Sequence, residues 1–537
     1  MNMDLGGKQS FGFKNIKDSG ATKWYLFVTM FGVSIWILLR LLNIGFVNYV
    51  RKCRFAASLP GPPALPIIGN AGVIIKYGVK NFFEAFNHYI VKYGTVFRFW
   101  AGPVPVIAIG EPEYIKEVLA TEGCEKCPFF YGFIETITNK NLFVTTDHEY
   151  QRKRKMYDVF FSLRNIDKAY LLVEQYTQQL LKRLETKEGV PFDIFRDILV
   201  MTGKTMMDSS RGFNLSTDDE VEYYTSGLDT AVKSIYARAM KPWLYVDALY
   251  KLSSTGRKIT NHFGGMQRKF FELAIEQRKM IAERENFQLN NNEKSAKKDE
   301  TFLDHMLKLQ EEGKLDDREM EAELTLLNAS GTETSSLTLS FCFLMLAMHQ
   351  DIQKDLYEEL CTVTAGQNRM LTKEELAKCP LLERVIKESL RHVAPPVVPR
   401  ITRHWLVLGK NLVIPPQTSL ALCVNVMHKN PKYWKKPKAF YPDHFLPENV
   451  AARPPNVFIP FITGIRKCPG YRYAMNQLRV VVSSVILNYE LTTDLKYEKL
   501  KFEFSLLMKL AGPYEVKIKK RRMTDSTEQK IPAELLN

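Results

Sequence analysis

The string from Phe461 to Gly470 carries the residue types that a thiolate metal centre needs. Within it Cys468 directly precedes Pro469, and an apolar segment typical of a helix follows. Proline suits the first position of a helix, so we expect Cys468 at a helix N-terminus, where free N–H groups and the helix dipole favour a thiolate. A thiolate is a strong electron-donating ligand for a haem iron. A single cysteine beside a turn is ordinarily a buried structural residue, so the hypothesis depends on the whole string.

Two neighbours of this cysteine suit the same role. Gly464 permits the tight loop that such a ligand requires, because glycine tolerates backbone conformations that other residues avoid. Arg466 is placed to meet a carboxylate of the haem through charge-assisted hydrogen bonds. The string therefore predicts a haem site with Cys468 as the iron ligand.

A second group of polar residues interrupts an apolar helical segment. Ser330 to Ser335 is largely polar, whereas Leu337 to Met348 is apolar on nearly all helical faces. Such a helix is buried, and a carboxylate or hydroxyl inside it is costly unless it is paired or used. One interpretation is a polar patch satisfied by backbone and water. The other is that Glu333 and Thr334 transfer protons as a general acid system.

Charged residues at two further places could act together. Glu388 and Arg391 are three residues apart, so they can pair on one helical face, although most such pairs are solvated and contribute little. The run from Arg152 to Lys155 is most simply a solvated charged face. Together with Lys467 and Arg472 it could instead form a basic surface that steers an acidic electron-donor protein.

The elements that must position these residues are mainly helical. Strands are expected at 95–100 and 104–109, as a hairpin, and at 406–408 and 412–414. A helix is expected from Glu111 to Ala120, with Pro112 in its first turn, and another from Tyr471 to Asn488. Most of the chain up to residue 393 has a helical pattern, so the predicted class is mainly α with small β-sheets.

The N-terminal part indicates a membrane anchor. Trp24 to Leu39 is apolar and, after Arg40, Leu41 to Val50 is largely apolar again, which together exceed the roughly 20 residues that span a bilayer. A buried core helix is the alternative. The predicted organisation is an N-terminal segment at 1–23, an anchor at 24–50, a basic and proline-rich hinge at 51–68, a catalytic domain at 69–522 and a tail at 523–537.

Composition narrows the partners and the compartment. The chain has 537 residues and a formal net charge of +15, which suits a membrane surface, an acidic protein or nucleic acid. No zinc-finger, RNA-binding or basic-zipper pattern occurs, so we expect no nucleic-acid partner. The eight cysteines are scattered, which favours a reducing compartment and free thiols. The lone pair Cys124 and Cys127 lacks the setting of a redox motif.

The string around Cys468 resembles the cysteine-ligand signature of the cytochrome P450 monooxygenases. Phe461, Gly464, Arg466, Cys468 and Gly470 are all in register, and the resemblance extends over nearly the whole chain. It implies the cytochrome P450 fold and a bound haem b (iron protoporphyrin IX). The stretch 382–391 and the loop 241–244 look most similar to the microsomal fatty-acid ω-hydroxylase branch, insect members included.

The resemblance also implies roles for the other motifs. Glu388 and Arg391 match a motif that locks the core behind the haem, but His444 stands where the family usually has its third partner, an arginine. Glu333 and Thr334 match the oxygen-activating segment, and Gly331 would leave room for the oxygen. Ser330 stands where ω-hydroxylases often carry a glutamate that esterifies the haem, so we expect no covalent link.

Three further residues are implied as haem contacts. Tyr150 stands where the family usually has tryptophan, and Arg154 matches the arginine four residues later; both would touch a propionate. Arg400 would hold the other propionate, with Arg403 as its rival. Phe461 and Arg466 would complete the cofactor contacts.

The implied function is a monooxygenase that inserts one oxygen atom from O2 into an apolar small molecule: a fatty acid, hydrocarbon, steroid or terpenoid, or xenobiotic. Electrons would come from NADPH through NADPH–cytochrome P450 reductase, with cytochrome b5 as a further candidate. Its expected place is the endoplasmic reticulum membrane, with the catalytic domain on the cytosolic side. The alternatives are a haem-thiolate isomerase or dehydratase that acts on peroxides without a reductase, and a membrane protein that binds haem without turnover.

Overall fold

A computed structural model describes residue 30 and residues 45–65, 68–70, 72–73, 82–212, 217–241, 244–290, 301–504 and 507–521. The chain divides into two compact units, Met1–Ser58 and Leu59–Asn537. In the first unit, residues 45–58 are helical. The first eight residues of the expected hinge therefore belong to a helix. The extended part begins at Leu59, where closely spaced prolines start and a helix cannot continue.

Most of the expected anchor, at 24–50, lies outside the described residues, as do the expected segments 1–23 and 523–537. Among the helices of the described ranges, none combines the length and the apolar character that a membrane crossing requires.

The second unit is built mainly from helices. Three short turns of other helix types are Thr260–Gly264, Pro442–Phe445 and Tyr497–Lys499. The α-helices are α3 Phe82–Tyr93, α4 Pro112–Ala120, α5 Pro128–Thr138, α6 Asp147–Phe160, α7 Leu163–Glu185, α8 Ile194–Arg211, α9 Asp218–Met240, α10 Asp247–Leu252, α11 Ser254–Ile259, α12 Gly265–Asn290, α13 Phe302–Glu311, α14 Asp317–Met348, α15 Gln350–Val363, α16 Lys373–Leu376, α17 Pro380–Val393, α18 Val424–Met427, α19 Pro447–Ala451 and α20 Tyr471–Asn488.

The strands form four small sheets. They are β1 Val96–Ala101, β2 Val104–Ile109, β3 Cys124–Glu125, β4 Phe192–Asp193, β5 Val398–Thr402, β6 Leu406–Leu408, β7 Leu412–Ile414, β8 Ser419–Leu422, β9 Tyr489–Thr492, β10 Phe502–Phe504, β11 Met508–Leu510 and β12 Glu515–Lys520. The largest sheet has the order β1-β2-β8-β5-β3, in which only β2 and β8 pair in parallel. The others are β4-β12-β9, β6-β7 and β10-β11. The predicted class, mainly α with small sheets, is confirmed.

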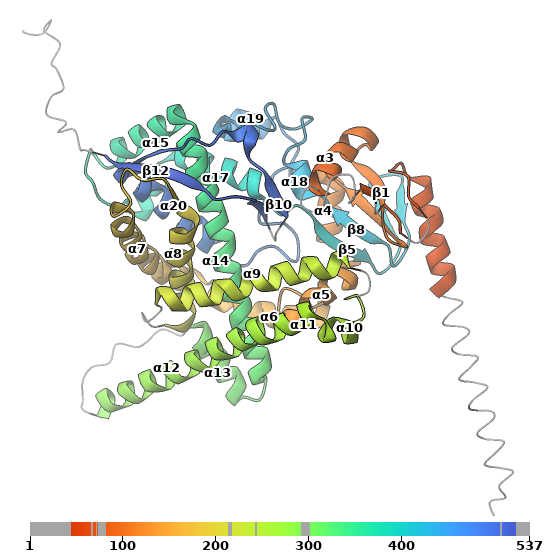
Figure 1. Cartoon of the computed structure of the whole chain (residues 1–537), viewed down its shortest axis with the longest axis horizontal. Coiled ribbons are helices and arrows are strands. Elements are labelled where there is room, and N and C mark those ends of the chain that lie inside the picture. The colour runs from red at the N-terminus through yellow and green to blue at the C-terminus, as the bar shows by residue number, and fades with distance from the viewer. Residues whose placement is uncertain are drawn as a thin grey trace, which may run out of the picture. The chain divides into compact units, whose positions relative to one another are not determined.

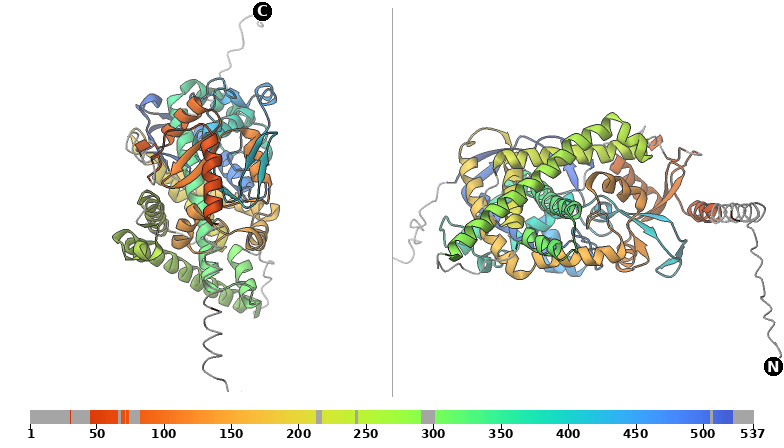
Figure 2. Two further views of the ribbon diagram at one scale, coloured as in Figure 1. Left: turned by 90° about the vertical axis from the view of Figure 1, so that its right-hand side faces the viewer. Right: turned by 90° about the horizontal axis from the view of Figure 1, so that it is seen from below.

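Figure 1 shows how these layers are arranged within the second unit. The five-stranded sheet lies at one side, and α7, α15 and α20 lie at the other, with α14 between them. Helices α9 and α12 cover one face, at the bottom of Figure 1 and toward the viewer in the right-hand view of Figure 2. The sheet and the helical part therefore enclose α14.

Helix α14 forms the centre of the hydrophobic core. Its N-cap Asp316 accepts a hydrogen bond from the Glu319 N–H, which satisfies one of the free donors at the helix start. Its C-terminal half is buried on all faces from Leu337 to Ala347, as its all-round apolar sequence predicts. This half packs against α17, α20 and β9, so it fixes the position of its polar segment around Ser330.

A wholly buried ion pair joins α17 to the segment that follows α18. Arg391 donates to both carboxylate oxygens of Glu388, at 2.9 and 2.7 Å. The same guanidinium donates to the carbonyl oxygens of His428, Pro437 and Ala439. Arg391 holds the pKa of the Glu388 carboxyl well below its usual range, against the opposing effect of burial. The pair is thus a hydrogen-bonded anchor for residues 428–439 and not a solvated surface contact.

His444 takes the place of the third partner in this network. Its Nδ1 lies 3.2 Å from Glu388 Oε2, and the Tyr441 N–H donates to Glu388 Oε1 at 2.8 Å. An arginine that the sequence did not reveal is also near: Arg453 stacks on the Trp434 ring at 4.0 Å and donates to the His444 carbonyl. A histidine therefore contacts Glu388 at the position where the resemblance implies an arginine, and the Arg453 guanidinium bonds to the backbone of that histidine.

Two further buried histidines adjoin Arg391. His392 Nε2 lies 2.8 Å from Arg391 Nη2 and 3.2 Å from the Ala439 carbonyl oxygen. Burial and the Arg391 charge lower the pKa of His392 to about 4. The same two causes lower the pKa of His428 to about 3, and its Nε2 accepts from the Ile459 N–H.

We expect acid to destabilise this cluster. The pKa of an ordinary histidine, 6.5, is higher than the pKa values of His392 and His428 in the folded protein, about 4 and about 3. As the pH falls below 6.5, the unfolded chain therefore binds more protons than the folded chain, and stability is lost. Each histidine should lower the free energy of unfolding by about 2 kcal/mol between pH 6.5 and 5. Urea unfolding across this pH range measures the loss.

His428→Gln should make the unfolding free energy less steep in pH by about one proton, because one titrating group is removed while an acceptor remains for Ile459 N–H. His88→Gln is the matched control, since it removes an exposed histidine. An equal pH slope in wild type and His428→Gln would contradict the prediction.

Candidate functional site

An apolar cavity of about 400 Å³ lies between α14 and the segment that contains Cys468. Its lining includes residues of α5, α9 and α14 and most of the segment 460–470. The segment 393–400, which leads from α17 into β5, also contributes to the lining. The motifs found near residues 330, 400 and 468 therefore meet at one cavity, although they are far apart in the sequence.

The segment 461–470 folds into a tight loop that presents Cys468 to the cavity. The Cys468 N–H donates to the Phe461 carbonyl at 3.0 Å, and the Lys467 N–H donates to the Gly464 carbonyl at 3.2 Å. Gly464 has φ +77°, and a Cβ there would lie 2.0 Å from the Leu119 carbonyl oxygen. Glycine is thus required both by the backbone conformation and by the approach of α4.

Ile462 also has a left-handed backbone, with φ +59°. A β-branched residue in this region is strained by about 1–3 kcal/mol, and such strain persists only where the surroundings impose it. The Ile462 N–H donates to the Ile459 carbonyl, and its side chain lines the cavity. The surroundings therefore hold Ile462 in an unfavourable backbone conformation, which sets the course of the loop at this point.

The prediction that Pro469 occupies the first turn of a helix was wrong. Helix α20 begins at Tyr471 and Gly470 is its N-cap, so Cys468 lies two residues before the N-cap. Burial raises the pKa of the Cys468 thiol, whereas the Gly470 N–H and the Arg154 charge lower it. The N–H group that favours a thiolate thus comes from a turn, and not from the first turn of the helix.

Three cations gather at one edge of the cavity. Arg466 donates to the Thr145 carbonyl at 2.6 Å, and Arg400, which is 4% exposed, donates to the Pro399 carbonyl at 2.9 Å. Lys126 is the third, and it donates to the Phe143 carbonyl. Burial and the charges of Arg400 and Arg466 lower the pKa of Lys126 well below its usual range. An anion at this edge would relieve that mutual repulsion.

The sequence did not reveal Lys126, which stands inside the Cys124–Cys127 pair. A single lysine in a short segment carries no periodic signal that distinguishes a buried side chain from an exposed one. The rival arginine, Arg403, is 42% exposed and forms an ion pair with Glu125. Arg403 does not line the cavity beside Cys468, whereas Arg400 does.

Tyr150 and Arg154 lie beside the same loop. The buried Tyr150 donates from its hydroxyl to the Ile465 carbonyl at 3.1 Å, and the Arg466 guanidinium lies 4.0 Å above its ring. Arg154 donates to the Lys467 carbonyl at 2.7 Å and to the Tyr150 hydroxyl at 3.2 Å. Tyr150 lines the cavity but Arg154 does not. Arg154 thus holds the backbone next to Cys468 from outside.

Helix α14 contributes Ser330, Gly331 and Thr334 to the cavity wall. The Ser330 hydroxyl donates to the Leu327 carbonyl at 3.1 Å, and the Thr334 hydroxyl donates to the Ser330 carbonyl at 2.6 Å. Glu333 is half-buried and is not part of the cavity lining. A Cβ on Gly331 would meet the flexible side chain of Met206 on α8, with Cε at 2.1 Å.

The donor set of the cavity fits haem b. A thiol and the hydroxyls of α14 line the cavity, and three cations close to one another match two propionate groups. Cys468 would hold the iron, and Lys126, Arg400, Arg466 and Tyr150 would hold the propionate edge.

Comparison with known proteins identifies the family. The family model described as "Cytochrome P450" matches residues 59–518. Cytochrome P450 4c21 of Blattella germanica is 27% identical over 88% of this chain and 95% of its own length. Cytochrome P450 4V2 of Homo sapiens is 25% identical over 88% and 92%, and probable cytochrome P450 313a4 of Drosophila melanogaster is 25% identical over 91% and 99%.

The match covers the whole second unit apart from its last residues, including the cavity, its cysteine loop and α14. Several of the similar proteins are cytochromes P450 4, from insects and mammals, which agrees with the branch expected from the sequence. The chain belongs to the cytochrome P450 family of haem-thiolate monooxygenases, in the branch that contains the cytochromes P450 4.

Proposed function

We propose that the chain binds haem b through Cys468 and inserts one oxygen atom of O2 into an apolar small molecule, with electrons from NADPH delivered by a reductase. The observation that carries this proposal is that Cys468 and Thr334, from distant parts of the sequence, line the same largely apolar cavity. When bound, haem supplies the activation of dioxygen, and the protein supplies binding, orientation and protons.

The apolar lining determines the kind of substrate. Phe130, Ile134, Val232, Ile235 and Leu326 line the cavity on the side of α5, α9 and α14. Three of the charged residues of the lining, Lys126, Arg400 and Arg466, are the cations that haem carboxylates would engage. The remaining surface selects an apolar substrate by burial of apolar area, so fatty acids, hydrocarbons, terpenoids and apolar xenobiotics are the proposed classes.

Thr334 is the proposed proton donor at the cavity surface. Its hydroxyl lies in the lining, and it is kept in place by its bond to the Ser330 carbonyl. Glu333, the next residue of α14, lies outside the lining and is proposed to supply Thr334 with protons from the solvent side.

Electron delivery is proposed to occur at the surface outside the cysteine loop. Arg152, Lys155, Lys467 and Arg472 are exposed there, on α6 and on the residues around Cys468. These cations would attract an acidic reductase and cytochrome b5. Lys153, which the sequence grouped with them, is buried and takes no part in this surface.

The proposed setting is the endoplasmic reticulum membrane, with the catalytic unit on the cytosolic side. Support comes from the apolar sequence at 24–50 and the net charge of +15. The proposed organisation keeps 1–23 as the N-terminal segment, 59–68 as the proline-rich spacer, 69–522 as the catalytic domain and 523–537 as the tail.

Cys468→Ala should abolish the thiolate-type Soret band of the reduced carbon monoxide complex, because alanine offers no iron ligand. Absorption spectra of the purified full-length chain measure this. Cys361→Ala, on α15, is the matched control and should keep the band. A thiolate-type band in the Cys468→Ala protein would rule out the proposed ligand.

Thr334→Ala should lower the yield of product per NADPH consumed by about tenfold or more, because the hydroxyl that delivers protons is lost. The measurement uses reductase, NADPH and a panel of apolar substrates. Thr338→Ala, one turn further along the same wall, should have a yield close to wild type. Product formed from a hydroperoxide without reductase, and none with it, would favour the isomerase alternative.

Acid–acetone extraction should release all the haem from the protein. Ser330 offers a hydroxyl that donates to the Leu327 carbonyl, and it has no carboxylate to form an ester with the haem. The absorbance of the extracted and precipitated fractions measures the release. Haem that stays with the precipitate would show a covalent link through another residue.

A further inference from the structure

The loop 139–146 joins α5 to α6 and contacts polar groups on two sides. Inside the loop, the Thr145 hydroxyl and the Val144 N–H bond to the Asn141 carbonyl, at 2.6 and 3.1 Å. The Phe143 N–H donates to Asn141 Oδ1 at 3.1 Å. These bonds make the segment 141–145 a compact turn whose two ends are joined by hydrogen bonds.

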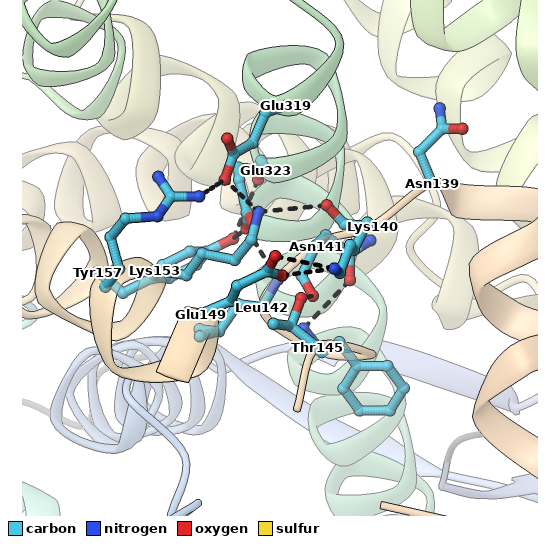
Figure 3. A network of polar contacts seen from close by, with 12 residues as sticks. Asn139, Lys140, Asn141, Leu142, Thr145, Glu149, Lys153, Tyr157, Glu319 and Glu323 are labelled. Atoms are coloured by element: carbon cyan, nitrogen blue, oxygen red, sulfur yellow. Dashed lines mark hydrogen bonds and ion pairs between the residues drawn. The ribbon is translucent and has the colours of Figure 1, made fainter. Parts of the chain in front are cut away.

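Two buried charges hold the outer side of this turn (Figure 3). Glu323 of α14 is 0% exposed, and its Oε2 accepts the Leu142 N–H at 3.1 Å. Lys153 of α6 is 1% exposed; its Nζ lies 2.7 Å from Glu323 Oε1 and donates to the Lys140 carbonyl at 3.2 Å. Tyr157 donates to Glu323 Oε2 at 2.9 Å. The pair thus bonds to the loop backbone from α14 and from α6.

The inner side of the same turn holds two of the cavity cations. The Phe143 carbonyl accepts from Lys126, and the Thr145 carbonyl accepts from Arg466 at 2.6 Å. Leu142 and Phe143 themselves line the cavity. A chain of direct contacts therefore runs from Glu323 through the loop backbone to the cations at the cavity edge.

We propose that Glu323 and Lys153 are positioning residues that act through the loop 139–146 to aim Lys126 and Arg466 at the haem propionates. The inference rests on the proposed binding of haem at Cys468. Neither residue lines the cavity: the pair reaches the loop through Leu142 and Lys140, and its other contact with a lining residue is the bond from Tyr157 to Glu323. The ion pair would thereby set the retention of haem and the hydrogen bonding of its propionates.

The chemistry of the pair favours this role over simple stabilisation. A buried ion pair contributes little net stability compared with apolar residues of the same volume, because both charges lose their hydration. Here the charges reach two backbone groups of a single loop, and that loop supplies two carbonyls to the cations. Such an arrangement fixes one loop conformation among several.

Haem loss from the ferric full-length holoprotein, followed by transfer to excess apomyoglobin, tests the proposal. Glu323→Gln and Lys153→Met should each speed haem loss by about tenfold or more, since one charge of the buried pair is lost. Glu319→Gln is the matched control on the same helix: Glu319 contacts Lys153 and Arg152 but has no bond to the loop, so haem loss should stay within about twofold of wild type.

Two measurements separate positioning from loss of stability. The propionate bending modes in the resonance Raman spectrum should shift in Glu323→Gln and in Lys126→Gln, but not in Glu319→Gln. The double variant Glu323→Leu with Lys153→Met leaves no unpaired charge, so it should regain thermal stability while still losing haem quickly.

Unchanged Raman bands in Glu323→Gln, or haem retention like wild type in the double variant, would overturn the inference. Failure of this inference can be distinguished from failure of the proposed function. If the proposed function is wrong, the wild-type protein itself lacks thiolate-ligated haem. If only this inference is wrong, the wild-type protein binds haem and the variants retain it equally well.

Discussion

The close approach between Gly464 and the Leu119 carbonyl is the contact on which the site depends. It leaves no space for a side chain, and it imposes a left-handed backbone two residues after the strained Ile462. Within this constraint the Cys468 N–H bonds back to Phe461, and the sulfur faces the cavity. The position of the ligand is therefore determined by the packing of the loop backbone against α4. This packing does not depend on the rotamer of the cysteine side chain.

Buried charges connect the walls around this loop. Glu388 and Arg391 tie α17 to the segment 428–444, and Glu323 and Lys153 tie α14 to α6. Charges in the interior cost hydration energy, and each of these pairs recovers it through bonds to backbone groups of a neighbouring segment. Their common effect is to select one arrangement of irregular segments that have few regular backbone hydrogen bonds of their own.

The regular elements and the central motif could be predicted from the sequence because their signals are local. The hairpin at 96–109 has proline and glycine at its turn, and α20 has a continuous apolar pattern from Tyr471 to Asn488. The roles of Lys126 and Arg453 could not be predicted, because each depends on a contact with a residue that is distant in sequence. Lys126 lies near Arg400, and Arg453 stacks on Trp434. In the sequence, Lys153 could not be distinguished from its exposed neighbours. It differs from them in being buried, because another helix covers it. The prediction that Pro469 lies in the first turn of the helix was wrong because a proline also suits the turn just before a helix.

The length of α14 makes it the common reference for the two sides of the site. Glu323 and Thr334 are eleven residues apart, which is about three turns and about 16 Å along the axis. The C-terminal half of the helix is buried in one core cluster, and Met320, Leu324 and Leu327 of the N-terminal half are buried in another. Loss of the bond from Leu142 to Glu323 would loosen the cations at the cavity edge while leaving Thr334 in its place. The binding of the cofactor and the delivery of protons can therefore be altered separately, although one helix serves both.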